Sequence, residues 1–304
     1  MDEHSYRERK GAKRILLTGA GPHGFIGRNI APALRERYTV FTPSSRELDL
    51  CNYDALARYV EAHRVDTVIH GAAQSPVHTG TEDAMCHDLQ MFFNLDKLSG
   101  QLDKVLYFGS GAEFDKRLPM ENVREEELGR SIPNEYYGLE KYIMAQYARA
   151  SCNIYNLRLF GVFGKYEHWQ SKFISNLCCK AVYDLPLTVR QNCMFDFLYV
   201  EYLPPIVIWF LEHSPKYHDY NVCTGEPVDL VSIAHTVLEC AGKDLPILVA
   251  RDGWNLAYTG DCSRLAAEYG PLQPHNLKTA ISDLYAYYLE HQAEIPCEEL
   301  EGTR

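Results

Sequence analysis

The stretch Arg14-Ile-Leu-Leu-Thr-Gly-Ala-Gly-Pro-His-Gly-Phe-Ile-Gly27 decides the fold. Its first five residues form a short apolar run of the kind found in buried β-strands. A glycine-rich segment follows, and residues 28–37 then place apolar side chains at Ile30, Ala33 and Leu34, which is the spacing of a helix. Strand, glycine-rich turn and helix together predict the front of a βαβ unit that binds a dinucleotide.

The glycines of this turn would let the backbone approach a pyrophosphate, and the first turn of the helix would offer free N–H donors to it. Two spacings fit: Gly21-x-x-Gly24-x-x-Gly27, or a turn that begins at Gly19 and carries two additional residues at Pro22-His23. The sequence does not separate them, and a glycine-rich turn without a ligand is the alternative to both. The cofactor contacts predicted in this turn are Gly19, Gly21, Gly24, Phe25, Ile26 and Gly27.

The end of the second predicted strand, Tyr38 to Phe41, bears on the choice of dinucleotide. NAD sites usually place Asp or Glu there to hold the ribose hydroxyls. The segment Thr42-Pro-Ser-Ser-Arg46 has no carboxylate, and Arg46 with two serines could receive a 2′-phosphate, although Arg46 fits a solvated loop charge equally well. We therefore expect NADP(H) to be preferred, with NAD(H) as the alternative. Further cofactor contacts are predicted at Asp49, Leu50, Ala72 and Ala73.

Strands and helices alternate as far as Gly164. Further strands are predicted at residues 65–70, 104–108 and 154–160, and helices at 53–63, 81–99 and 134–150. Alternation of this length specifies the α/β class with a doubly wound parallel sheet, the Rossmann fold.

The alternation fades beyond Gly164, where a smaller α+β lobe is expected to fold over the first and close a cleft. Its predicted helices are residues 173–183, 202–213, 230–240 and 277–289, and its predicted short strands are residues 187–190, 195–200 and 218–222. The expected organisation is a flexible tail (1–13), a dinucleotide-binding domain (14–164), a lobe that mainly binds substrate (165–293) and a loose acidic tail (294–304).

The composition of the chain argues against several classes of function. A net charge of −11 argues against binding nucleic acid or an anionic membrane, because both need a basic surface. The ten cysteines show no C-x-x-C and no zinc-ligand spacing, so no metal site is expected. The longest apolar run, Leu203 to Leu211, is too short to span a bilayer, and the polar N-terminus does not resemble a signal peptide. These features predict a reduced, cytoplasmic enzyme.

Tyr137 and Lys141 are the first candidates for catalysis. They are four residues apart, so on a helix they lie one turn from each other on one face. A neighbouring ammonium favours the phenolate, which would let Tyr137 exchange a proton near neutral pH. By itself such a pair is more often a surface contact. Ser110 adds to it, because a serine at the carboxyl end of a strand points into the crevice where open α/β sheets bind ligands.

Six motifs, taken in order, resemble the extended short-chain dehydrogenase/reductases, which are the NAD-dependent epimerase/dehydratase family. The resemblance runs from about Arg14 to about Leu289, and many members of that family modify nucleotide-activated sugars. The motifs are Thr18-Gly with Gly24-Phe-Ile-Gly27, His70-Gly-Ala-Ala73, Gly109-Ser-Gly-Ala112, Tyr137-x-x-x-Lys141, Arg158-Leu-Phe-Gly-Val-Phe-Gly164 and Asp196-Phe-Leu-Tyr-Val200.

The resemblance implies that Ser110, Tyr137 and Lys141 form a catalytic triad and that the C-terminal lobe holds a nucleotide-diphosphate sugar. Substrate contacts are predicted at Ser110, Gly161 and Arg190, although Arg190 also fits a surface charge. The resemblance further implies a homodimer in which the predicted helices 81–99 and 134–150 pair with their symmetry mates. The apolar side chains available for that contact are Met91, Phe92, Leu95, Tyr142 and Met144, of which some must face the sheet.

Departures from the family pattern narrow the reaction. Sugar-nucleotide 4,6-dehydratases carry Asp-Glu directly after the triad hydroxyl, and GDP-fucose synthases carry a cysteine two residues after it, whereas this chain has Gly111-Ala112. Water elimination and carbon-acid epimerisation at C3 or C5 are therefore both disfavoured. Asp88 and Gly161 replace asparagines usual in the family, and Phe195 replaces a common arginine, which puts the substrate contacts in doubt.

The reaction that remains is hydride transfer at a sugar ketone or hydroxyl. The expected function is an NADPH-dependent 4-keto-sugar-nucleotide reductase. Two alternatives stay open, a C4 epimerase that retains its NAD and a non-catalytic dinucleotide-binding sensor or scaffold.

Overall fold

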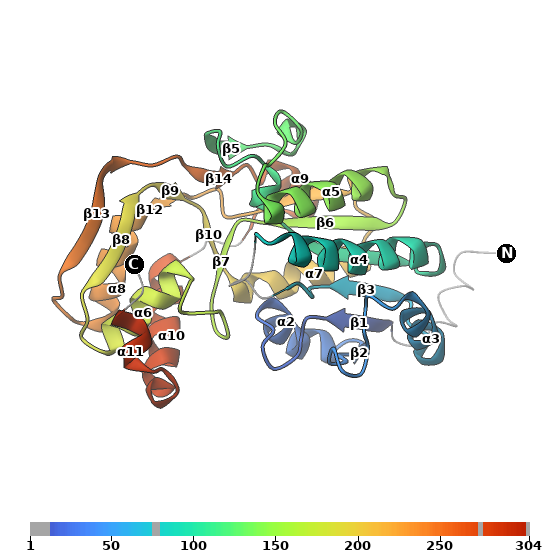
Figure 1. Cartoon of the computed structure of the whole chain (residues 1–304), viewed down its shortest axis with the longest axis horizontal. Helices are drawn as coiled ribbons and strands as arrows, with labels where there is room; N and C mark the ends of the chain where they lie inside the picture. The colour runs from blue at the N-terminus through green and yellow to red at the C-terminus, as the bar shows by residue number, and fades with distance from the viewer. Residues whose placement is uncertain (1–12, 75–79, 273–275, 302–304) are drawn as a thin grey trace.

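A six-stranded parallel sheet forms the core of one of two lobes, the one on the right of Figure 1. The computed structural model describes residues 13–74, 80–272 and 276–301. The strand order across the sheet is β11-β6-β4-β3-β1-β2. These strands are β1 (Arg14–Thr18), β2 (Thr39–Phe41), β3 (Thr67–His70), β4 (Lys104–Ser110), β6 (Ile154–Leu159) and β11 (Asp219–Val222). The predicted fold class, a doubly wound parallel α/β sheet, is confirmed.

Helices cover both faces of this sheet. On one face α2 (Ile26–Arg35) packs with α7 (Leu203–Glu212), and both contribute to one buried apolar cluster. On the other face α3 (Tyr53–His63), α4 (Glu82–Leu98) and α5 (Tyr136–Ala150) contribute to a second. Each predicted helix of this half lies within three residues of an observed one. Side-chain caps explain two of the starts, because Asn52 and Thr81 each accept a hydrogen bond from the backbone three residues on.

The C-terminal lobe has a helical layer and three small sheets. Its helices include α6 (Phe173–Val182), α8 (Leu230–Ala241) and α10 (Leu277–Glu290), which pack on one another, with α9 (Ser263–Tyr269) and α11 (Cys297–Glu301). One two-stranded sheet pairs β8 (Leu187–Asn192) with β13 (Ile247–Trp254), and another pairs β7 (Gly161–Phe163) with β10 (Phe197–Tyr199). The third has the order β12 (Val228–Asp229), β9 (Met194–Phe195), β14 (Tyr258–Gly260), β5 (Met120–Val123).

The chain crosses between the two lobes in both directions. Strand β11 comes from the C-terminal half and completes the parallel sheet, and α7 from the same half packs with α2 on one face of it. Strand β5 comes from the N-terminal half and joins the four-stranded sheet of the other lobe. A boundary at residue 164 therefore does not divide the chain into two continuous units.

The segment that begins at residue 294 packs on the core, which corrects the prediction of a loose tail. The side chains of Ile295 and Leu300 are buried in the core, and Gln170 donates a hydrogen bond to Glu299. Acidic residues alternate with these apolar ones, so the composition of the segment concealed its buried face. No helix in the part of the chain that the structure describes is both long and apolar enough to cross a membrane.

Candidate active site

The glycine-rich turn after β1 is too tight for side chains at three positions. Gly19 has a φ of +73°, and a Cβ there would lie 2.3 Å from the carbonyl oxygen of Gly71. A Cβ on Gly24 or on Gly27 would lie 2.0 or 2.5 Å from the carbonyl oxygen of Gly19. Gly21, in contrast, has no heavy atom within 4 Å of that position. The close approaches favour the spacing that begins at Gly19.

This arrangement fits the pyrophosphate of a dinucleotide. The backbone that a Cβ would obstruct lies at the carboxyl end of β1 and immediately before α2, whose first N–H groups have no intrahelical acceptor. Phe25 occupies the N-cap position and makes no side-chain cap bond there, and Ile26 begins the helix. The additional residues Pro22 and His23 are exposed.

A hydroxyl joins the ends of β1 and β3 beside this turn. Thr18 Oγ1 accepts hydrogen bonds from the backbone N–H of Gly71 (3.1 Å) and of Ala72 (3.2 Å), so its own proton is available to His70 Nδ1 at 3.0 Å. Burial, and then the charge of Lys141, lower the pKa of His70 to about 3, so the imidazole is neutral. Among the predicted cofactor residues here, Ala72 is half-buried and Ala73 is exposed.

Charged side chains of both signs lie at the loop after β2. Arg46 is exposed, which fits both a solvated loop charge and a ligand of a 2′-phosphate. Ser44, two residues earlier, donates both its backbone N–H and its hydroxyl to Glu47 Oε2, each at 2.8 Å. Arg35, from the last turn of α2, donates to Thr42 Oγ1 at 2.9 Å. The loop itself carries the guanidinium of Arg46 and the carboxylates of Glu47 and Asp49, and Arg35 reaches it from α2.

The other two residues predicted in this region differ in exposure. Asp49 is exposed, and its carboxylate accepts a hydrogen bond from the backbone of Cys51. Leu50 is buried in the core under α3 and α4.

The three predicted catalytic residues come from neighbouring elements. Ser110 is the last residue of β4, and the short turn Gly111–Glu113 that follows it packs against the start of α5. Gly138 permits this contact, because a Cβ there would lie 2.6 Å from the carbonyl oxygen of Ala112. Lys141 is buried, and its Nζ lies 5.8 Å from the centroid of the Tyr137 ring.

Tyr258 is a residue of this site that sequence reasoning missed. Its hydroxyl is hydrogen-bonded to Ser110, and it would lie 2.5 Å from a Cβ on Gly111. Its ring stacks on Phe195 with centroids 4.7 Å apart. Burial raises the pKa of Tyr258 above its ordinary value. No sequence signal pointed to Tyr258, because it lies on a strand, β14, that was not predicted.

A buried ion network supports Ser110 from behind. Glu113 accepts a hydrogen bond from the Ser110 backbone N–H at 3.1 Å, and its other oxygen lies 2.5 Å from Arg158 Nε. Arg158 in turn bonds Asp219 at 2.9 Å. Glu113 and Arg158 have no exposed surface, so this network holds the turn but leaves Glu113 no access to a ligand.

The predicted substrate residues are not all brought to the triad. Gly161 pairs with β10, and a Cβ there would lie 2.5 Å from the ring of Phe195. The aromatic ring therefore covers the place where a side chain at position 161 would begin. Arg190 is exposed on β8, which pairs with β13 in a two-stranded sheet of the C-terminal lobe. Ser110 alone of the three is part of the triad.

The apolar residues expected at a dimer interface belong mostly to the core. Met91, Phe92, Leu95 and Met144 are buried within one chain, so they are the ones that face the core, and the dimer itself stays a prediction. Tyr142 is half-buried.

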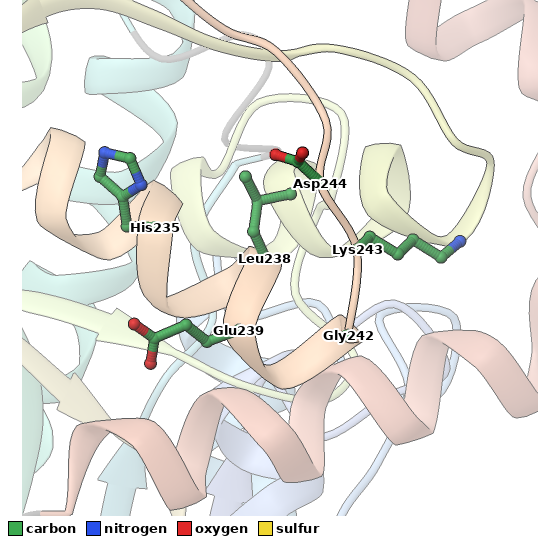
Figure 2. A pocket seen from close by; sticks show the side chains of 6 residues that line it. All are labelled: His235, Leu238, Glu239, Gly242, Lys243 and Asp244. Carbon is green, nitrogen blue, oxygen red and sulfur yellow. The ribbon is translucent and has the colours of Figure 1, made fainter.

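A separate depression lies at the end of α8 (Figure 2). It is lined by His235, Leu238, Glu239, Gly242, Lys243 and Asp244. The Lys243 ammonium lies 2.9 Å from Asp184 and bonds the carbonyl oxygen of Ala181 at 2.6 Å, so its charge is satisfied by the protein. Within the described residues, no group of three or more His, Cys, Asp or Glu side chains is arranged to hold a metal ion.

Comparison with known proteins assigns the family. Residues 15–223, well over half of the chain, match the NAD dependent epimerase/dehydratase family. The chain belongs to this family. It is therefore an enzyme of the NAD(P)-dependent oxidoreductase and epimerase type. This membership argues against the alternative of a non-catalytic dinucleotide-binding scaffold.

Individual relatives agree with this assignment. The GDP-L-colitose synthase of Yersinia pseudotuberculosis is 24% identical over 320 residues, which cover 92% of this chain and 99% of the relative. A GDP-L-fucose synthetase from Naegleria fowleri superposes with a TM-score of 0.82 at 17% identity, covering 92% and 94% of the two chains. The GDP-mannoheptose C4 reductase of Campylobacter jejuni, solved with NADP bound, gives a TM-score of 0.77 at 16% identity, covering 92% and 99%.

Proposed function

We propose that this family member is an NADPH-dependent reductase of a 4-keto, nucleotide-activated sugar. The observation that carries the proposal is the composition of the site around Ser110. Ser110 ends β4 beside the start of α5, which carries Tyr137 and the buried Lys141, whereas the two positions after the serine are Gly111 and Ala112, which offer no acid, base or thiol. Such a site can exchange a proton and a hydride at one carbonyl, whereas positions 111 and 112 supply no second group for elimination or for deprotonating a carbon.

Each residue has one task in this reaction. The dinucleotide, when bound, supplies the hydride. Ser110 donates a hydrogen bond to the keto oxygen, and Tyr137 transfers its phenolic proton to the same oxygen as the carbonyl becomes a hydroxyl. Lys141 keeps a positive charge beside the phenolate that forms. The hydroxyl of Tyr258 holds the Ser110 side chain in place.

Two features support NADPH as the reductant. The glycine turn at Gly19, Gly24 and Gly27 fits a pyrophosphate, and Arg35 and Arg46 offer guanidinium groups for a 2′-phosphate. Glu47 opposes this preference, since its carboxylate occupies the donors of Ser44. Two of the relatives are named as enzymes of GDP-linked sugars, which supports a nucleotide-diphosphate sugar as the substrate.

The test is turnover of a freshly generated GDP-4-keto sugar with NADPH, followed as loss of reduced nicotinamide absorbance and checked by mass spectrometry of the product. A product two hydrogens heavier than the substrate supports the reductase. The alternative, a C4 epimerase, would interconvert two sugar nucleotides of equal mass without added reductant and would retain NAD through purification. That result, or the absence of any reduction, would overturn the proposal.

A further inference from the structure

The guanidinium of Arg28 joins the glycine-rich turn to the C-terminal lobe. Arg28 is half-buried in the first turn of α2, and its Nη1 donates a hydrogen bond to the carbonyl oxygen of Pro22 at 3.0 Å. Its Cζ also lies 3.6 Å from the centroid of the Tyr166 ring, which comes from the loop between β7 and α6. A guanidinium over a ring face is attracted to it, so the two contacts together hold this long side chain in one place.

The hydrogen bond from Arg28 reaches the added part of the turn. Pro22 and His23 are its two additional residues, and both are exposed. A backbone hydrogen bond from the Gly24 N–H to the Gly21 carbonyl oxygen, at 2.8 Å, closes the chain around them. A longer turn has more conformations to lose when it binds a ligand. The bond to Pro22 therefore restricts the added residues before a dinucleotide binds.

The position of Arg28 along α2 favours a bound anion. The first turn of a helix carries a partial positive charge, which repels a cation placed there. Helix α2 has no acidic residue in its first turn to balance Arg28. A pyrophosphate at the glycine-rich turn would supply the missing negative charge, so the placement of Arg28 is least costly when the dinucleotide is bound.

Tyr166 is held in an unusual backbone conformation. Its φ is +70°, which a bulky residue rarely adopts and keeps only where its surroundings fix it. The ring packs edge-on against Tyr287 of α10, with centroids 5.9 Å apart. Next to it, the carbonyl oxygen of Lys165 accepts a hydrogen bond from the side-chain amide of Asn29 in α2, at 2.9 Å. These contacts keep the ring face towards Arg28.

We propose that Arg28 is a positioning residue for the dinucleotide, which holds the glycine-rich turn in its binding shape and takes its own orientation from Tyr166. The affinity for the dinucleotide then depends on a side chain outside the dinucleotide-binding half of the chain. The inference rests on dinucleotide binding, which comes with the family, and it holds for a reductase and for an epimerase alike. Neither residue takes part in the chemical step.

The first experiment measures the dissociation constants of NADPH and NADH by titration calorimetry, without a sugar substrate. Arg28→Met keeps most of the side-chain stem and removes the guanidinium. We expect both dissociation constants to rise by about 10-fold, which corresponds to about 1.4 kcal/mol. The ratio between them should not change, because the turn serves the pyrophosphate that both cofactors share. A loss confined to NADPH would overturn the inference, since Arg28 would then be a ligand of the 2′-phosphate.

The second experiment replaces Tyr166 and tests the link between the lobes. Tyr166→Asn removes the ring but keeps a residue type that tolerates a positive φ, and it should weaken both cofactors as much as Arg28→Met does. Tyr166→Phe, which keeps the ring, should retain the affinity. The double variant should lose no more than either single variant, because both act through one contact. An unaffected Tyr166→Asn, or losses that multiply in the double variant, would overturn the inference.

Arg37→Met is the matched control for a lost guanidinium. Arg37 follows the other end of α2, about 15 Å from its start, and pairs with Glu212 of α7 at 3.4 Å. It should leave both cofactor affinities unchanged, and its melting temperature should agree with that of Arg28→Met within about 2 °C. Equal weakening in the control, or a larger fall in melting temperature for Arg28→Met, would assign Arg28 a purely structural role. Calorimetry needs no turnover, so the result does not depend on what the enzyme reduces.

Discussion

Replacing Tyr258 with phenylalanine tests whether the C-terminal lobe takes part in positioning the triad. The substitution removes the hydroxyl that bonds Ser110 and keeps the ring, whose contacts with Phe195 (4.7 Å) and Phe160 (5.4 Å) hold it in place. A hydrogen bond of this kind contributes about 0.5–1.5 kcal/mol net, so kcat/KM for the keto substrate should fall roughly 2- to 10-fold.

The double-mutant cycle gives the sharper result. If Tyr258 acts by orienting the Ser110 hydroxyl, Tyr258→Phe should have almost no effect in a Ser110→Ala background, because the group that it orients is gone. Steady-state kcat/KM of the four proteins, with NADPH saturating, measures the coupling. Independent losses that multiply in the double variant would refute the reasoning, and so would an unchanged rate in Tyr258→Phe alone. Melting curves of the same proteins show whether the fold is retained.

Four further outcomes are expected. Tyr137→Phe should bind substrate normally but lower kcat by about 100-fold or more, as measured by steady-state kinetics. Arg46→Ala should weaken NADPH binding by about 10- to 100-fold and leave NADH nearly unchanged, whereas Glu47→Gln should strengthen NADPH, both by titration calorimetry. Sedimentation at micromolar concentration should give a dimer; a monomer would contradict the expected pairing of α4 and α5. Burial raises the pKa of Glu167 from 4.5 to about 7, so its stabilising contribution is lost as the pH rises through 7, and Glu167→Gln should reduce the fall in melting temperature between pH 5 and pH 8.5 without changing kcat.

The fold of the first half was predictable because local signals and the sheet pattern agree. The apolar run at Arg14–Thr18 and the glycine turn act over a few residues, and the structure has a strand and a tight turn there. The caps at Asn52 and Thr81 were not predicted, but they are equally local and start the helices that were. The glycine spacing was not predictable in the same way. Gly21 and Gly19 look alike in the sequence, and only the close approach of Gly71, from another strand, separates them.

The second half defied prediction where strands are exposed or short. Most of β13 faces solvent, and β14 has three residues, so neither shows the apolar alternation that identifies a strand. Tyr258 could not be assigned to the site for this reason.

The departures from the family pattern are linked in space. Gly111 stands where the dehydratases have an acid, and the phenol of Tyr258 occupies the room that a side chain there would need. Gly161 stands where an asparagine is usual, and the ring of Phe195 covers it. The two aromatic rings stack on each other, so the changes at the two glycines are linked through one pair of rings. A motif comparison counts them as separate defects. Because one pair of rings lies beside both glycines, the substitutions support the narrower reaction proposed above and do not by themselves argue for an inactive enzyme.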